Sequence, residues 1–177
     1  RVFARIMTGL SAEAPDNKTI SIDATYLKAI AGLKPAVKKG GSGRLIGRTN
    51  GGMNTKLHAI MDAIGDLFGF HNGRADPGAR ALVDSLPAAD GLLGDRGYDA
   101  DWFREALVDR GIKPCIPGRK SRDKPIKYDK CRYKRRNPIE IMFGRFKDWR
   151  RTSTRYDRCT KVFLSAIALA ATILFWL

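Results

Sequence analysis

The sequence predicts an α/β domain in which a mixed sheet carries helices on both faces. A chain of 177 residues is long enough for one domain whose core covers both sides of a sheet. Short apolar runs alternate with segments of helical periodicity, which favours a layered α/β arrangement. Two of the apolar runs end in an aspartate, which indicates strands that carry an acid near one edge of the sheet.

The first part of the chain predicts three strands and a loop. Residues 19–30 are rich in β-branched side chains and place Asp23 after an apolar run, which predicts a strand. Residues 34–52 are glycine-rich and basic without periodicity, so we expect a loop. Residues 53–75 predict two strands about a turn at Gly65-Asp66, because a Gly-Asp pair favours a hairpin.

The middle of the chain repeats this pattern around a second aspartate. Asp76 and Pro77 predict the start of a short helix, as its N-cap and first helical residue. The next apolar run ends at Asp95, and a helix is expected to begin between residues 99 and 101. Residues 113–118 predict a further strand, and a basic connector then leads to two final helices.

The first of these helices carries an acid, Glu140, in a strongly basic stretch. Asn137 and Pro138 form an N-cap and first-position pair, and Glu140 then falls where a capping box places its glutamate. Because Pro138 disfavours helical backbone at Asn137, we expect Tyr133 and Arg136 to lie outside this helix. Its apolar stripe comprises Ile139, Met142, Phe143, Phe146 and Trp149.

The C-terminal segment, residues 162–177, is apolar apart from Ser165 and Thr172. It is short for a membrane span, so we interpret it as a buried core helix packed against the sheet and expect no membrane partner. A membrane anchor is the alternative interpretation, because basic residues flank the segment.

The formal net charge of +15 is concentrated in residues 119–161, which hold 17 basic and 5 acidic side chains. A concentrated basic surface attracts phosphate backbones, so nucleic acid is the first expected partner and an anionic membrane surface the second. A solvated basic tail is the alternative. The interleaved aromatic residues argue against a tail, because disordered segments are poor in aromatics.

The three cysteines are odd in number and show no CxxC spacing, so we expect neither a disulfide framework nor a structural zinc site. This usage is typical of a reduced, cytoplasmic protein. No signal peptide is visible, and the chain begins with Arg rather than Met, so we expect its start to be internal.

Asp23, Asp95 and Glu140 are candidates for one metal site, because both aspartates follow strand runs and the glutamate opens a helix that could cross the sheet. Carboxylates that lie close together repel unless cations hold them. Such oxygen ligands suit Mg²⁺ or Mn²⁺, and two of these ions can stabilise the attacking and leaving oxygens of a phosphoryl displacement. A helix cap is the alternative role of Glu140.

Tyr133, Arg136, Glu140 and Lys147 form a known signature, with two, three and six residues between them. With the upstream segments SIDATYLKA and LLGDRGYDADWFREAL, the sequence resembles the DDE transposases of bacterial insertion sequences. The resemblance is to the insertion-sequence-five type, within the insertion-sequence-four-like transposases, and covers about residues 20–177.

The resemblance implies a ribonuclease H-like catalytic domain over residues 20–177, with residues 1–19 as the remnant of an upstream region. It implies metal-dependent DNA strand cleavage at transposon ends and strand transfer into target DNA, by a homo-oligomer on DNA at the bacterial nucleoid. Asp23, Asp95 and Glu140 would be the catalytic and metal-binding triad, with Mg²⁺ or Mn²⁺ as two bound ions.

The same resemblance implies that Tyr133, Arg136 and Lys147 contact DNA near the cleaved phosphate. Arg150 and Arg151 add basic charge to this surface, and we expect them to bind DNA as well.

Two features depart from the family pattern. Ile30 stands where relatives commonly have a histidine, which would remove a polar contact near the site, and Pro138 stands just before the glutamate, where relatives usually lack proline. Members of the family also carry an N-terminal region that recognises the ends of the element, and we expect this chain to lack most of it and to work with an upstream-encoded N-terminal part. A DNA-binding remnant that keeps the fold but does not transpose is the alternative function.

Overall fold

The computed structural model describes residues 19–30, 46–62, 67–72, 82–84 and 86–175. These residues form a seven-stranded sheet of order β2-β3-β1-β5-β6, in which β4 also pairs with β3 and β7 with β1. The strands are β1 (Thr19–Ala29), β2 (Gly47–Thr49), β3 (Gly52–Asp62), β4 (Leu67–Asn72), β5 (Gly91–Gly94), β6 (Lys113–Cys115) and β7 (Thr154–Arg155).

The sheet is antiparallel on one side of β1 and parallel on the other. β3 pairs antiparallel with β1 and with β4, whereas β5 pairs parallel with β1 and β6 parallel with β5. A parallel pair needs a crossover, which α3 (Asp101–Asp109) provides between β5 and β6. The predicted mixed α/β class is confirmed, and β1 lies at the centre of the sheet.

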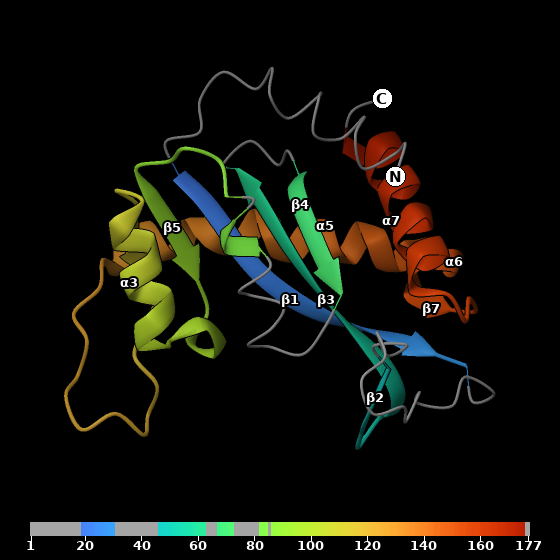
Figure 1. Cartoon of the computed structure of the whole chain (residues 1–177), viewed down its shortest axis with the longest axis horizontal. Helices are drawn as coiled ribbons and strands as arrows, with labels where there is room; N and C mark the ends of the chain where they lie inside the picture. The colour runs from blue at the N-terminus through green and yellow to red at the C-terminus, as the bar shows by residue number, and fades with distance from the viewer. Residues whose placement is uncertain (1–18, 31–45, 63–66, 73–81, 85, 176–177) are drawn as a thin grey trace.

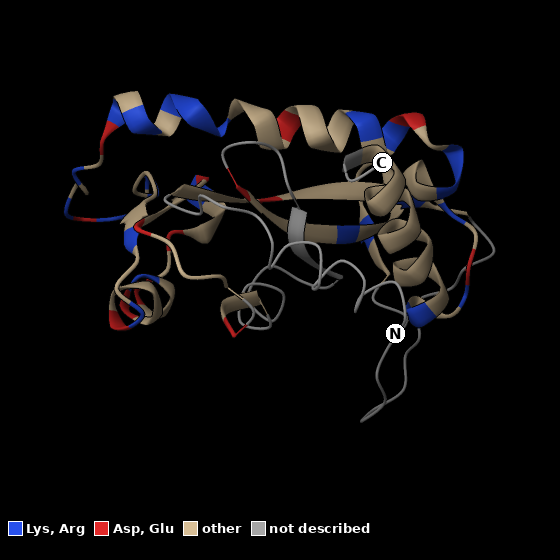
Figure 2. Ribbon diagram, turned by 90° about the horizontal axis from the view of Figure 1, so that it is seen from above, with Lys and Arg blue, Asp and Glu red and all other residues tan. Residues whose placement is uncertain are grey.

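Helices cover both faces of the sheet (Figures 1 and 2). The remaining helical segments are η1 (Arg96–Tyr98), α4 (Lys130–Tyr133), η2 (Lys134–Arg136), α5 (Asn137–Asp148), α6 (Arg150–Ser153) and α7 (Thr160–Phe175). On one face β1 and β3 pack against α5 and α7 through a core that includes Leu27, Leu57, Met61, Phe146 and Phe163. On the other face β1, β3 and β5 pack against α3 through Ile22, Ile60, Leu92, Phe103 and Leu107. β3 serves both cores because its side chains alternate between the faces.

The strand predicted at residues 19–30 is β1, and the predicted hairpin is the antiparallel pair of β3 and β4. The loop predicted over residues 34–52 is wrong near its end, because β2 pairs with β3 there. Gly52, at φ 99°, occupies a backbone region open to glycine and so permits the tight connection. The turn at Gly65-Asp66 and the helix start at Asp76 lie outside the described residues.

The start of α5 differs from the prediction. α4, η2 and α5 follow one another directly along one face of the sheet (Figure 2), and Asn137 has helical φ and ψ of −50° and −37°. No side chain caps α5, whose N-cap position is held by Arg136. The predicted capping box is therefore wrong, and Tyr133 and Arg136 continue into the helical run of Glu140. The 3₁₀ turn η2 interrupts the α-helical pattern before Pro138, so the missing N–H of proline costs little there.

The apolar C-terminal segment forms α7 and packs on the sheet, as predicted. Within the described ranges, no helix combines the length and the apolarity needed to cross a membrane. Beneath α7 lies the fully buried Arg155, which donates to Thr55 Oγ1 at 3.0 Å and to the Asp157 carbonyl at 2.9 Å. Its guanidinium also lies 5.2 Å from the ring centroid of Phe163, so Arg155 joins β7 to both β3 and α7.

Candidate active site

The register of the sheet brings Asp23 and Asp95 side by side. β1 and β5 pair in parallel, with Ile22 opposite Gly94. Asp23 and Asp95 follow these two residues directly, so they stand at the same level on neighbouring segments of the chain. Opposite residues of a parallel pair point to the same face of the sheet. The two predicted aspartates therefore meet at the end of β5.

Asp23 is a half-buried carboxylate that is only partly neutralised. Its side chain is 14% exposed, and its carboxylate accepts the N–H of Ala24 at 2.8 Å and lies 2.9 Å from Nη1 of Arg136. Burial raises the pKa of Asp23, and the negative charge of Asp95 raises it further. The hydrogen bond from Ala24 and the charge of Arg136 oppose this rise without cancelling it.

Arg136 bridges Asp23 and Glu140. Its Nη2 donates to Glu140 Oε1 at 2.7 Å while its Nη1 pairs with Asp23, and its side chain is 15% exposed. Because the guanidinium contacts both acids, the predicted cluster of three carboxylates is not formed. Among the residues that the structure describes, no three Asp, Glu, His or Cys side chains are grouped to hold a metal ion. In this structure Glu140 pairs with Arg136, so a metal site shared by Glu140 and the two aspartates stays a prediction.

Asp95 opens the tight 3₁₀ turn η1. Its Oδ1 accepts the N–H of Gly97 at 2.8 Å, and its carbonyl accepts the N–H of Tyr98 at 3.1 Å. A Cβ atom at Gly97 would stand 2.8 Å from Asp95 Oδ1, so glycine permits this close approach. The turn thereby fixes the carboxylate of Asp95 just beyond the end of β5.

A cavity of about 160 Å³ lies at this turn, against β1 and β3. Besides Asp23 and Asp95, it is lined by side chains that the sequence did not single out, namely Tyr26, Lys56, His58 and Tyr98. His58 Nδ1 and Tyr98 Oη lie 2.7 Å apart, and burial raises the pKa of Tyr98 well above its ordinary value. The sequence signal that could have indicated His58 is the presence of a histidine within the apolar run of β3. Its place opposite Ala24 follows only from the strand register.

The other predicted DNA contacts lie along the run from α4 to α6. Tyr133 lies beside the acid site, with its ring centroid 5.6 Å from the guanidinium carbon of Arg136. Lys147, Arg150 and Arg151 are exposed at the far end of the run. Figure 2 shows Lys and Arg gathered toward both ends of this helical run.

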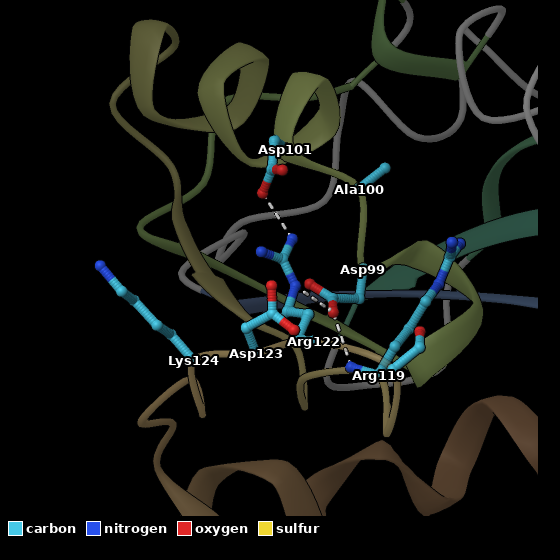
Figure 3. A pocket seen from close by; sticks show the side chains of 8 residues that line it. Asp99, Ala100, Asp101, Arg119, Arg122, Asp123 and Lys124 are labelled. Carbon is cyan, nitrogen blue, oxygen red and sulfur yellow. Dashed lines mark hydrogen bonds and ion pairs between the residues drawn. The ribbon is translucent and has the colours of Figure 1, made fainter.

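A fully buried acid, Asp99, lies between η1 and α3 (Figure 3). Its carboxylate accepts hydrogen bonds from Arg104 Nε at 2.8 Å and Arg122 Nε at 2.7 Å, and from the backbone N–H of Arg119 at 2.6 Å. Burial raises the pKa of Asp99, but these three donors outweigh burial and lower it to about 2. Asp99 lines a pocket of about 530 Å³ together with Asp101.

The residues present fit a divalent cation in part. Asp23 and Asp95 offer carboxylate oxygens, the ligands that Mg²⁺ and Mn²⁺ prefer, and they line one cavity. A cation beside them would offset the repulsion that raises the pKa of Asp23. Glu140 could add a third oxygen ligand only after the guanidinium of Arg136 leaves its place against both acids.

The sheet, in which β1 stands between antiparallel β3 and parallel β5, has the arrangement of the predicted ribonuclease H-like fold. The family model for the transposase DDE domain matches residues 92–177. A Brucella ovis protein assigned as the transposase of insertion sequence element IS6501 is 32% identical over 132 residues, which cover 71% of this chain and 99% of that protein. The chain belongs to the DDE transposases of insertion sequences, which are enzymes of DNA transposition, and the predicted family is confirmed.

Two solved structures align with the chain as well. A chain of the simian T-cell lymphotropic virus intasome in complex with PP2A regulatory subunit B56 gamma aligns with a TM-score of 0.52 and 12% identity, over 92% of this chain and 50% of that chain. The Mos1 mariner paired end complex with Mn aligns with a TM-score of 0.35 and 14% identity, over 64% of this chain and 40% of that chain. This chain therefore spans half or less of these solved chains, and the first likeness supports the fold.

Proposed function

We propose that this chain is the catalytic domain of a transposase that cleaves DNA strands at the ends of its element and joins the freed 3′ hydroxyl to target DNA. In this proposal Asp23, Asp95 and Glu140 hold two ions of Mg²⁺ or Mn²⁺. The observation that carries it is the pair of aspartates that line one cavity at the centre of the sheet. The bound ions would supply Lewis-acid stabilisation of the attacking and leaving oxygens.

The protein side chains have separate tasks in this proposal. Asp95 presents a carboxylate that the N–H of Gly97 holds in place, and Asp23 presents one that is desolvated and short of positive charge. Arg136 neutralises Asp23 and Glu140 until the ions bind, and then exchanges these partners for a DNA phosphate. A guanidinium suits this exchange because its planar fork binds carboxylate and phosphate alike.

The helical run from α4 to α6 is the proposed DNA surface. Tyr133 lies next to the acid site, and Lys147, Arg150 and Arg151 are exposed farther along. Lys and Arg contacts to phosphate oxygens would position the DNA without reading its sequence. Assembly as a homo-oligomer on DNA, with an upstream-encoded N-terminal part, belongs to the same proposal.

The test is metal-dependent cleavage of a duplex that carries the terminal repeats of the element, with the complete protein and Mn²⁺ or Mg²⁺. Glu140→Gln keeps the shape of the side chain and removes its charge. We expect cleavage to fall about 100-fold or more, because a metal ligand matters at least as much as the outer-shell groups that support it. Stability should change by at most about 0.5 kcal/mol, because the pair with Arg136 is an i,i+4 pair with an exposed glutamate.

Glu105→Gln on α3 is the matched control, since Glu105 is an exposed glutamate that no proposed contact involves. Asp95→Asn should lose cleavage as Glu140→Gln does. Full cleavage by Glu140→Gln alone would remove that residue from the site and leave the two aspartates. Full cleavage by both variants would refute the proposed function. DNA binding by the wild-type protein without any cleavage would favour the DNA-binding remnant instead.

A further inference from the structure

The loop between β6 and α4 folds back onto the turn that follows Asp95. Its Arg119 donates from Nε to the carbonyl oxygen of Arg96 at 3.2 Å and from Nη2 to the carbonyl oxygen of Gly97 at 2.9 Å. A single side chain thus holds two successive carbonyls of the exposed 3₁₀ turn η1. The sequence separation of 22 and 23 residues makes this a tertiary contact, which no local pattern would indicate.

These two carbonyls belong to the peptide units that set the orientation of Asp95. The N–H of Gly97 donates to Asp95 Oδ1 at 2.8 Å, while the carbonyl of the same glycine accepts from Arg119. Arg96 and Gly97 are both exposed, so core packing holds neither of them. A shift of this turn would therefore move the carboxylate of Asp95 relative to Asp23.

Arg119 is itself anchored at its backbone. Its N–H donates to Asp99 Oδ2 at 2.6 Å (Figure 3). Asp99 is fully buried and is also held by Arg104 of α3. The contacts form a closed ring that runs from Asp95 through Gly97 and Arg119 to Asp99 and back along η1. This ring, anchored on a buried ion pair, adds to the turn's own two backbone hydrogen bonds.

We infer that Arg119 is a positioning residue that holds Asp95 in the orientation needed to bind the metal ion. The inference rests on the proposed function, because it takes Asp95 as a metal ligand. Arg119 does not line the cavity that Asp23 and Asp95 share, so it acts on Asp95 through the backbone of Arg96 and Gly97. Groups that orient a metal ligand typically change metal affinity 10- to 100-fold when removed.

The experiment compares Arg119→Ala with Lys120→Ala in the complete protein. Lys120 is the neighbouring exposed cation, so its variant loses the same charge from the same loop. Mn²⁺ binding without DNA is measured by calorimetry, and cleavage of a terminal-repeat duplex is measured against Mn²⁺ concentration. We expect Arg119→Ala to weaken Mn²⁺ binding about 10- to 100-fold and to raise the Mn²⁺ concentration for half-maximal cleavage by the same factor. The rate at saturating Mn²⁺ should stay within a few-fold of wild type, and Lys120→Ala should match wild type.

Arg119→Gln is a second variant. Because glutamine keeps one donor group, this variant should lose less Mn²⁺ affinity than Arg119→Ala. If Arg119→Ala does not fold, the Mn²⁺ affinity of Arg119→Gln tests the inference instead. Equal losses in Arg119→Ala and Lys120→Ala would overturn the inference in favour of a general charge effect. Unchanged Mn²⁺ binding with weaker DNA binding and a lower salt slope would overturn it in favour of a direct phosphate contact. Asp95→Asn is run in parallel, and full Mn²⁺-dependent cleavage by that variant would refute the proposed function itself.

Discussion

Asp99 is a buried aspartate and Asp23 a half-buried one, and both contact arginine, but the number of donors around each carboxylate differs. Two guanidinium groups and one backbone N–H surround Asp99. They overcome the effect of burial and lower its pKa to about 2. Asp23 has one guanidinium and one backbone N–H, and it stands beside a second acid. Burial therefore prevails there, and the pKa of Asp23 is raised.

The difference separates an acid that stabilises the fold from an acid available to a ligand. A buried charge is tolerated when its hydrogen-bonding capacity is met, as it is at Asp99. An acid with too little positive charge around it gains from an added cation, which is a property expected of functional sites. The segment Asp95–Asp99 joins the two environments. Asp95 lines the cavity beside Asp23, and Asp99 lies in the ion pairs with Arg104 and Arg122.

The largest stability effect is expected from Asp99→Asn. The change removes the charged partner of Arg104, which is 15% exposed, and leaves Arg122, which is 25% exposed, with Asp101 as its remaining acid. We expect the free energy of unfolding to fall by about 2 to 4 kcal/mol, measured by denaturant unfolding at neutral pH. Asp123→Asn is the matched control in the same pocket, because Asp123 is exposed. A loss of unfolding free energy below about 0.5 kcal/mol would mean that the ion pairs of Asp99 contribute no more than ordinary surface ion pairs.

The pH dependence of the same pair of proteins sharpens this test. Because the pKa of Asp99 falls from 3.8 to about 2 on folding, its contribution is complete above pH 3.8 and is lost as the pH falls through about 2. Wild-type stability should therefore fall more steeply than that of Asp99→Asn between pH 4 and pH 2. Parallel curves for the two proteins would contradict the assignment of the low pKa to Asp99.

A smaller effect, opposite in its pH dependence, is expected from Asp23→Asn. The raised pKa of Asp23 means that its ionised form costs stability, so wild-type stability falls as the pH rises from 3.8 through the raised value and the variant lacks this fall. With Mn²⁺ at 10 to 100 times its Kd, wild type should gain about 1.4 to 2.7 kcal/mol and the variant nothing. Thermal melting with and without Mn²⁺ measures this, and Asp109→Asn on α3 is the control. Equal metal stabilisation of wild type and Asp23→Asn would rule out Asp23 as a ligand.

The fold class and most elements could be predicted because their signals are local. β1, the β3–β4 hairpin and α7 each follow from the periodicity of their own residues. β2 could not be predicted, because its three exposed residues have no periodicity and form a strand only by pairing with β3. The continuous run from α4 to α5 was missed because the 3₁₀ turn η2 lets the chain pass Pro138 without leaving helical backbone.

The candidate site could likewise be predicted only where its signals are local. Asp23 and Asp95 could be placed because each follows an apolar strand run, and parallel pairing then sets them together. The place of Arg136 could not be predicted, since its contact with Glu140 depends on helical backbone at Asn137. The contact of Arg119 with the η1 turn depends on a tertiary fold-back of a loop, for which the sequence carries no periodic signal.

The smallest effect on stability, and a distinct effect on binding, is expected from charge removal at the far end of the helical run. Arg150→Gln and Arg151→Gln should each weaken DNA binding and reduce the slope of log affinity against log salt by about one for each phosphate that the protein no longer neutralises. The fold should lose less than about 0.5 kcal/mol, because Arg151 is 70% exposed and stands 3.7 Å from its partner Asp157. Titration of a fluorescent duplex at several salt concentrations measures the slope. Arg110→Gln, at the end of α3 on the other face, is the control of equal charge. If all three variants shift the slope alike, net charge rather than this surface governs binding, and the proposed DNA path along α5 and α6 is wrong.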